Sequence, residues 1–210
     1  MSLIAGVLDL IDLMATLSIR RPVFHSEADF QFAFAQAVTA ADPRVQVRLE
    51  VRQTSDRAEY VDLVCWTPQQ RTLIEFKYAT AGWVGTDPHG EAFYVRNHAA
   101  YDLARRYFIH DIHRLETFTS EQPGTDGHAI MLTNEKGLWT ERGRPDARDR
   151  NFRLHDGRTL TGHLQWGSGD SPRYDQTLTG TYTLAWRDYS DLGQPKAQFR
   201  WLAVAMSSGA

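Results

Sequence analysis

Apolar residues recur along the chain with two different periods, and together these periods predict a mixture of helices and strands. Residues 3–17 carry apolar side chains at helical spacing, which predicts an amphipathic helix. Ser26 is a good N-cap, so we expect a second helix to begin there and to end before Pro43. A long third helix is expected at 98–118, with Asn97 as its cap.

Other segments follow the period of two that is typical of strands. Residues 45–52 alternate strictly between apolar and polar, which predicts a strand with one buried and one solvent-facing side. Residues 60–66 and 71–78 are rich in β-branched and aromatic side chains and flank a turn, which predicts a β-hairpin. Further strands are expected at 92–95, as part of a small hairpin, and at 128–133, 159–166, 178–189 and 198–207.

Length and composition fit one folded domain. The chain has 210 residues, 42% of them hydrophobic and 11% aromatic, which describes a globular protein with a sizeable core. No segment has the composition of a linker, so we expect a single domain over 1–210, with a core at about 26–133 and a C-terminal β extension at about 134–210. The expected fold class is α/β (α+β), with additional C-terminal antiparallel strands.

The formal net charge of -3 means that any contact with nucleic acid has to come from a local basic patch. Two groups of arginines are candidates for such phosphate contacts. Arg48 and Arg52 lie on the polar side of the strand at 45–52, and Arg148 and Arg150 lie in an arginine-rich segment. A solvated surface explains both groups at least as well.

The sequence also bears on the compartment. Cys65 is the single cysteine, so an internal disulfide is excluded, and its place in a strand indicates a core residue rather than a nucleophile. No apolar run is long enough to span a membrane, and the first residues lack the basic segment of a signal peptide. We therefore expect a cytoplasmic protein with no membrane contact.

Two further sets of side chains allow more than one interpretation. Trp83, Phe93 and Tyr94 could stack on bases if they are exposed, or could equally cover the core. His110 and His113 have the spacing of a metal pair, but surface histidines explain them better because no third ligand has a matching spacing.

The predicted hairpin at 60–78 carries charge in an apolar setting. Glu75 and Lys77 point to the same side of the second strand, and Asp62 interrupts the first strand. Charges in a buried sheet are costly unless they meet each other or a cation. The hairpin is therefore the first candidate for a functional site.

The order of these residues resembles the PD-(D/E)xK nuclease superfamily, which includes restriction endonucleases, Holliday-junction resolvases and repair nucleases. Glu27 in the second helix, Asp62 in the first hairpin strand and Glu75-Phe76-Lys77 in the next match the acids and the E-x-K pair of that group. Val61 precedes Asp62 where the motif has proline. The resemblance implies a restriction-endonuclease-like fold, with a central mixed β-sheet flanked by helices. The segments 96–116, 129–135 and 181–190 are also similar to a group of uncharacterised bacterial proteins with this core.

The resemblance also implies a metal-dependent nuclease that hydrolyses phosphodiester bonds of DNA with a metal-activated water. Asp62, Glu75 and the backbone carbonyl of Phe76 would hold Mg²⁺ or Mn²⁺. Glu27 would act through a water or a second metal, and Lys77 would orient the water or stabilise negative charge. Relatives of this fold often dimerise, so the resemblance leaves the choice between a monomer and a homodimer open.

Two other functions fit the same sequence. A catalytically silent nuclease-like fold would bind nucleic acid or a protein without cleaving it. A component of a protein assembly would use the N-terminal amphipathic helix or an exposed sheet edge.

Overall fold

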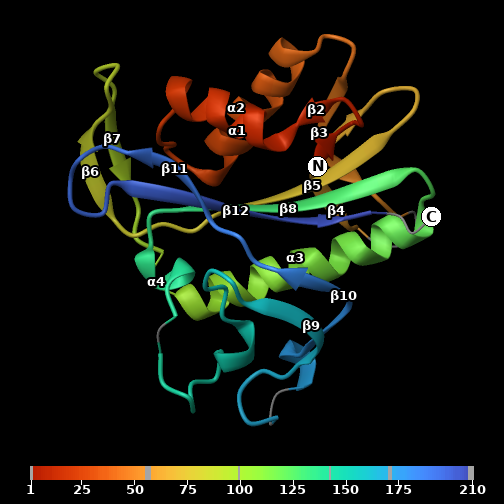
Figure 1. Cartoon of the computed structure of the whole chain (residues 1–210), viewed down its shortest axis with the longest axis vertical. Coiled ribbons are helices and arrows are strands. Elements are labelled where there is room, and N and C mark those ends of the chain that lie inside the picture. Colours follow the sequence, from red (N-terminus) through yellow and green to blue (C-terminus); the bar gives the residue numbers. More distant parts are fainter. Residues whose placement is uncertain (1, 55–57, 99, 142, 170–171, 208–210) are drawn as a thin grey trace.

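The computed structural model describes residues 2–54, 58–98, 100–141, 143–169 and 172–207. Within these residues, six strands form a central mixed sheet in the order β11-β12-β8-β5-β4-β3 (Figure 1). Neighbours in this sheet are antiparallel except β5 and β8, which run parallel. The strands are β3 (Gln46–Arg52), β4 (Tyr60–Trp66), β5 (Arg71–Tyr78), β8 (Thr125–Thr133), β11 (Arg187–Asp191) and β12 (Gln198–Met206). The expected α/β class with a mixed sheet is confirmed.

Helices cover both faces of the sheet (Figure 1). Helices α1 (Leu10–Arg20) and α2 (Glu27–Ala41) lie on one face, and α3 (Tyr101–Glu121) lies on the other. On the α2 face the ring of Phe76 packs against Phe30 and Phe34, with centroids 5.0 and 5.1 Å apart. On the α3 face Leu73 packs in the same apolar cluster as Ile112. Because side chains alternate along β5, Glu75 and Lys77 share the face of Leu73 and point toward α3.

The start of α2 follows the sequence closely. Ser26 is the N-cap, and its hydroxyl accepts a hydrogen bond from the backbone N–H of Asp29 at 3.2 Å. The helix therefore begins at Glu27, as predicted, and this residue is fixed in the first turn beside the sheet.

The predicted helix at 3–17 is wrong in its first half. Leu3–Ile4 (β1) and Leu8–Asp9 (β2) pair as a small antiparallel ribbon, and the helix starts only at Leu10. Between the two strands Ala5 and Gly6 have φ of 51° and 73°, which a right-handed helix does not allow. The Asp9 side chain then caps α1 by accepting from the N–H of Ile11 at 2.7 Å.

The start of α3 also differs from the prediction. Its N-cap is Ala100, which makes no side-chain cap hydrogen bond, and the helix runs to Glu121. Asn97 is not the cap, because its side chain accepts from the hydroxyl of Tyr101 at 3.1 Å instead.

A small hairpin of β6 (Trp83–Thr86) and β7 (Ala92–Val95) projects beyond the end of the sheet (Figure 1). The return strand predicted at 92–95 is confirmed. Trp83 and Phe93 are 5% and 1% exposed, so they cover the core and are not available to stack on bases. Tyr94 is 73% exposed.

The C-terminal third divides into two parts. Strands β11 and β12 extend the central sheet, whereas β9 (Thr159–Leu164) and β10 (Gln176–Thr183) form a separate hairpin that packs on α3. The run predicted as one strand at 178–189 is interrupted after β10, and β11 begins only at Arg187. Short helices α4 (Lys136–Trp139), η1 (Arg150–Phe152) and η2 (Pro172–Tyr174) lie between these strands.

Candidate functional site

The β4–β5 hairpin places Asp62 beside Glu75. Leu63 pairs with Ile74, so the next positions along the two strands are Asp62 and Glu75, which face the same side of the sheet. The regular backbone pairing of β4 with β5 ends at the Leu63–Ile74 pair. Oδ2 of Asp62 then accepts a hydrogen bond from the backbone N–H of Phe76 at 2.7 Å.

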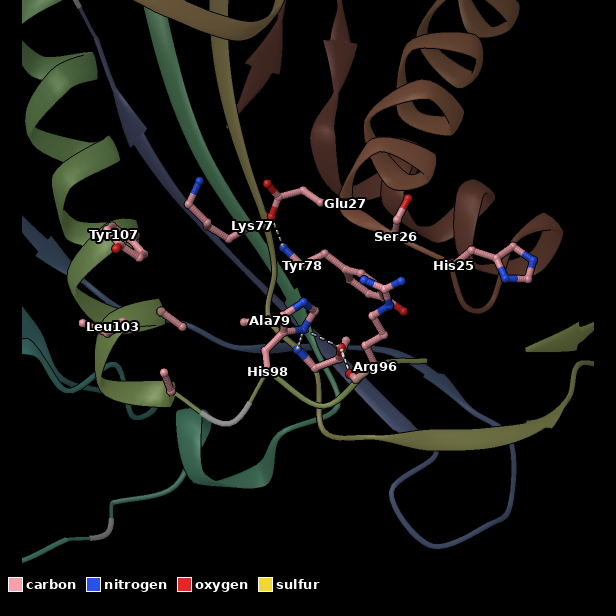
Figure 2. Close-up of a pocket in the computed structure, with 13 residues that line it drawn as sticks. His25, Ser26, Glu27, Lys77, Tyr78, Ala79, Arg96, His98, Leu103 and Tyr107 are labelled. Atoms are coloured by element: carbon pink, nitrogen blue, oxygen red, sulfur yellow. Dashed lines mark hydrogen bonds between the residues drawn. The ribbon is translucent and has the colours of Figure 1, made fainter. Parts of the chain in front are cut away.

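Glu27 joins the same region from the first turn of α2. Its Oε2 accepts from the backbone N–H of Tyr78 at 2.7 Å, as Figure 2 shows. Phe76 and Tyr78 lie beyond the paired part of β4, so their N–H groups need acceptors other than the neighbouring strand. Two side-chain carboxylates supply those acceptors, and they flank Lys77 as a result.

Helix α3 contributes two residues that sequence reasoning did not place in the site. Nζ of Lys77 lies 2.9 Å from Oδ2 of Asp111, and Nη1 of Arg114 lies 2.8 Å from Oε1 of Glu75. Nη2 of Arg114 also donates to the carbonyl of Tyr60 at 2.5 Å. Asp111 could have been found in the sequence, because it interrupts the buried side of α3 between Phe108 and Leu115, where an acid needs a partner.

The site carries more acids than cations, and several of its groups are buried. Glu75 is 3% exposed and Asp111 is 5% exposed. Burial, and then the nearby charges of Asp111 and Asp62, raise the pKa of Glu75 to about 9 in spite of Arg114 and Lys77. Burial likewise raises the pKa of Asp111 to about 6, against the opposing effect of Lys77.

The two remaining groups that shift do so for related reasons. Burial raises the pKa of Glu27, although the charge of Lys77 works against this. Burial alone would lower the pKa of Lys77, but the charges of Asp111 and Glu27 outweigh it and the pKa is raised. Lys77 is therefore a protonated cation. The positive charges of Lys77 and Arg114 are not enough for all the surrounding carboxyl groups to ionise together.

The oxygen donors at this point suit a hard divalent cation. Asp62 and Glu75 lie on one face, and the carbonyl of Phe76 accepts from Nζ of Lys77 at 3.1 Å. In the part of the chain that the structure describes, no group of three or more His, Cys, Asp or Glu side chains is arranged to hold a metal. Mg²⁺ usually keeps several waters and takes only one or two carboxylates.

A buried oxygen without a donor supports this fit. Although Arg114 is close, Oε1 of Glu75 accepts no hydrogen bond of good geometry from the described residues. A buried carboxylate oxygen in that state is costly. The donor set and the excess of carboxyl groups over cations therefore match Mg²⁺ or Mn²⁺ in their chemistry.

A pocket of about 660 Å³ opens beside Lys77 and Glu27 (Figure 2). It lies between the start of α2, the end of β5, the segment after β7 and the first turns of α3. Asp62 and Glu75 do not line it. Of the proposed site residues, Glu27 and Lys77 therefore face the pocket, whereas the two expected metal ligands do not.

No protein-family model, curated protein or solved structure matches this chain. Its function therefore has to be argued from the site itself. Among the described residues, no helix is long and apolar enough to cross a membrane.

The four arginines predicted to contact nucleic acid are spread over different elements. Arg52 pairs with Tyr60 at the end of β3 that is near the site. Arg48 lies further along β3, with its guanidinium 5.8 Å from the Trp66 ring. Arg148 is engaged by Asp102 at the start of α3, and Arg150 is an exposed residue of η1.

The other ambiguous side chains have structural partners. Nδ1 of His113 lies 3.0 Å from the carbonyl of Thr177, and Nδ1 of His110 lies 3.4 Å from Oε1 of Gln176, so both contact β10. Cys65 is fully buried, and burial raises the pKa of its thiol to about 12, which confirms it as a core residue.

Proposed function

We propose that the protein is a metal-dependent nuclease of the PD-(D/E)xK type that hydrolyses phosphodiester bonds of DNA. The observation that carries this proposal is the meeting of Glu27, Asp62 and the Glu75–Lys77 pair at the end of β5. These residues come from α2, β4 and β5, and their convergence is what the resemblance implies. A structural ion-pair network would not require this order of elements.

The arrangement of the sheet supports a restriction-endonuclease-like core. Helix α2 is followed by the antiparallel strands β3, β4 and β5, then by the β6–β7 hairpin and α3, and then by β8, which pairs parallel with β5. Apart from the β6–β7 hairpin, α2 to α3 follow the α-β-β-β-α order that the resemblance implies. Asp62 and Glu75 lie where β4 and β5 separate, and Glu27 and Lys77 face the pocket by which a substrate strand would approach.

Each residue has a role that follows from its contacts. A bound Mg²⁺ or Mn²⁺ would supply Lewis acidity and an activated water. Asp62 and Glu75 would hold it, with the carbonyl of Phe76 as a further donor. Lys77, fixed by Asp111, would orient the water or stabilise negative charge on the phosphate. Glu27 would act at the pocket side, where it also holds the end of β5 in place.

Cleavage assays with matched variants test the proposal. Plasmid DNA and single-stranded oligonucleotides are incubated with Mg²⁺, Mn²⁺ or EDTA. We expect metal-dependent cleavage that is lost in Asp62→Asn and Lys77→Met and kept in Asp188→Asn, whose carboxylate is 78% exposed on β11. Cleavage that survives in Asp62→Asn, or no cleavage by the wild-type protein under any of these conditions, would contradict the proposal.

A silent nuclease-like module is the second candidate, and one observation favours it. Lys77 and Arg114 already lie against Asp111 and Glu75, so the acids have partners without a metal. On this alternative, nucleic-acid binding would be insensitive to Glu75→Ala and would weaken with salt. Binding without metal-dependent cleavage, unchanged in Glu75→Ala, would favour the silent module.

A further inference from the structure

The pocket beside Lys77 has two chemically different walls. Lys77, Arg96 and His98 give polar and cationic groups on one side (Figure 2). Leu103, Ala104 and Tyr107 of α3 give an apolar wall that ends in an aromatic ring. A phosphate with an attached ring system is the kind of ligand that matches both walls.

The cationic wall is held in place before any ligand binds. Oγ1 of Thr80 donates to the carbonyl of Arg96 at 2.8 Å, and the N–H of His98 donates to the carbonyl of Thr80 at 2.8 Å. These bonds fasten the segment after β7 to the end of β5. Rigid positioning of this kind reduces the entropy cost of binding.

Two polar groups on this wall remain available. Nδ1 of His98 faces Thr80, 3.3 Å from its backbone N and 3.0 Å from its Oγ1, so Nε2 is the ring nitrogen left for a ligand. The guanidinium of Arg96 makes no hydrogen bond or ion pair with the described residues. Both residues line the pocket, so Arg96 can donate to a phosphate and Nε2 of His98 can form a hydrogen bond with a phosphate or a sugar.

The size of the pocket limits what can enter. A volume of about 660 Å³ is within the range of sites for single small molecules, which is about 300–1,000 Å³. It has room for one nucleotide, and contact with the α3 wall needs the face of its base to be unstacked. A paired base would first have to leave the duplex, which costs a few kcal/mol.

We infer that this pocket binds one unpaired nucleotide of the substrate, next to the bond that is cleaved. Arg96 and His98 contact its phosphate and sugar, and the base lies against Tyr107 and the adjacent wall of α3. The substrate class that follows is DNA with an unpaired nucleotide at the cleavage point, such as a single strand, rather than a blunt duplex. This inference rests on the proposed nuclease function and specifies its substrate.

Equilibrium binding in EDTA tests the pocket without cleavage. A fluorescein-labelled single-stranded oligonucleotide is compared with a blunt duplex of the same sequence. Because stacking of a base on an aromatic side chain contributes about fivefold to a hundredfold in affinity, we expect the single strand to bind at least about fivefold more tightly, with this preference lost in Tyr107→Ala. Arg96→Ala should weaken binding of the single strand as well.

The controls separate the pocket from general effects. Phe32→Ala removes another exposed aromatic side chain, 56% exposed on α2 and outside the pocket, and should keep wild-type binding. Ala104→Trp fills the apolar wall and should abolish the preference even if Tyr107→Ala is poorly folded, with circular dichroism reporting the fold of each variant.

The outcomes also separate this inference from the nuclease proposal. Equal binding of the two DNA forms, or a preference that persists in both Tyr107→Ala and Ala104→Trp, overturns the nucleotide pocket while metal-dependent cleavage of duplex can still stand. A single-strand preference that depends on Tyr107, in a protein that cleaves nothing, supports the pocket and removes the nuclease.

Discussion

Two buried glutamates provide a direct test of how the site is built, because the same substitution should change stability in opposite directions. Glu75 is 3% exposed in the proposed site, and Glu116 is 8% exposed between α3 and β10. We predict that Glu75→Gln stabilises the protein in the absence of metal and that Glu116→Gln destabilises it. The reason lies in the partners of the two carboxylates.

The magnitude for Glu75 follows from its raised pKa. At pH 7 the folded protein keeps this carboxyl protonated, whereas the unfolded chain ionises it with a pKa near 4.5. The difference between pH 7 and that value is about 2.5 units, which corresponds to about 3 kcal/mol in favour of the unfolded state. A glutamine does not ionise, so Glu75→Gln removes up to about 3 kcal/mol of this cost.

The magnitude for Glu116 follows from its hydrogen bonds. Its carboxylate accepts from the N–H of Thr179 at 3.0 Å, from the N–H of Gly180 at 2.7 Å and from the hydroxyl of Tyr182 at 2.8 Å. In Glu116→Gln one of the two carboxylate oxygens is replaced by an NH₂ group. That group is a donor and would face the N–H and hydroxyl donors instead of accepting from them. Hydrogen bonds to a charged group are worth about 1.5–3 kcal/mol, so Glu116→Gln should lose about that amount.

Urea unfolding at pH 7 with EDTA, followed by the fluorescence of the six tryptophans, measures both changes. The midpoint should rise for Glu75→Gln and fall for Glu116→Gln. If Glu75→Gln lowers the midpoint as Glu116→Gln does, the carboxylate of Glu75 is a satisfied structural group and the reasoning about the site is wrong.

Metal provides the complementary measurement. A ligand that binds only the folded state at a hundred times its Kd stabilises that state by about 2.7 kcal/mol. We expect Mg²⁺ or Mn²⁺ to raise the midpoint of the wild-type protein and of Glu116→Gln but not that of Glu75→Gln. An equal shift in all three proteins would place metal binding elsewhere.

Three further predictions concern single side chains. Ser26→Ala removes the cap of α2 and should lower stability by about 1 kcal/mol, measured by urea unfolding, whereas an unchanged midpoint would show that the cap is dispensable. Asp111→Asn removes the carboxylate that pairs with Lys77 and should lower kcat of the proposed cleavage while KM is unchanged, and a change in KM alone would contradict this positioning role. His128 is buried and neutral, and burial lowers its pKa to about 4, so stability should be fully present above pH 6.5 and fall by about 3 kcal/mol as the pH drops to 4. The slope of the unfolding free energy against pH in this range should be smaller in His128→Leu. An identical slope would refute the assignment of this pH dependence to His128.

The parts of the fold that the sequence predicts are those set by local pattern. The strands 60–66 and 71–78 are recovered with the same bounds because alternation and a turn containing Pro68 decide them locally. Helix α2 begins where Ser26 predicts, since the cap is a contact within four residues. Asp62 and Glu75 meet because the register of a hairpin follows from its turn.

The parts that were missed depend on contacts between distant segments. Asp111 and Arg114 enter the site only because α3 packs over β5, and no spacing in the sequence fixes which of its residues will meet Glu75. The ribbon at 3–9 has an apolar spacing that also fits a helix. Ala5 is nevertheless buried in the core, where its N–H donates to Oγ1 of Thr72 at 2.8 Å. In both cases tertiary packing decides among locally allowed structures.

The backbone of β5 links the stability of the sheet to the placement of the proposed catalytic groups. The N–H groups of Phe76 and Tyr78 have no main-chain acceptor on the side of β4, because the ladder ends at Ile74. Asp62 and Glu27 take that place, so both acids are held in position by the sheet whether or not a metal is bound. Alanine at either position would therefore leave a backbone donor unpaired and unsettle Lys77 as well.

This double role decides which substitutions report on function. Asp62→Asn keeps an oxygen that can accept from Phe76 while it removes the charge that a metal needs, whereas Asp62→Ala removes both. A loss of cleavage in Asp62→Asn with an unchanged unfolding midpoint would isolate the chemistry from the fold. The same loss accompanied by unfolding would show that the acid mainly completes the sheet, which is what the silent module requires.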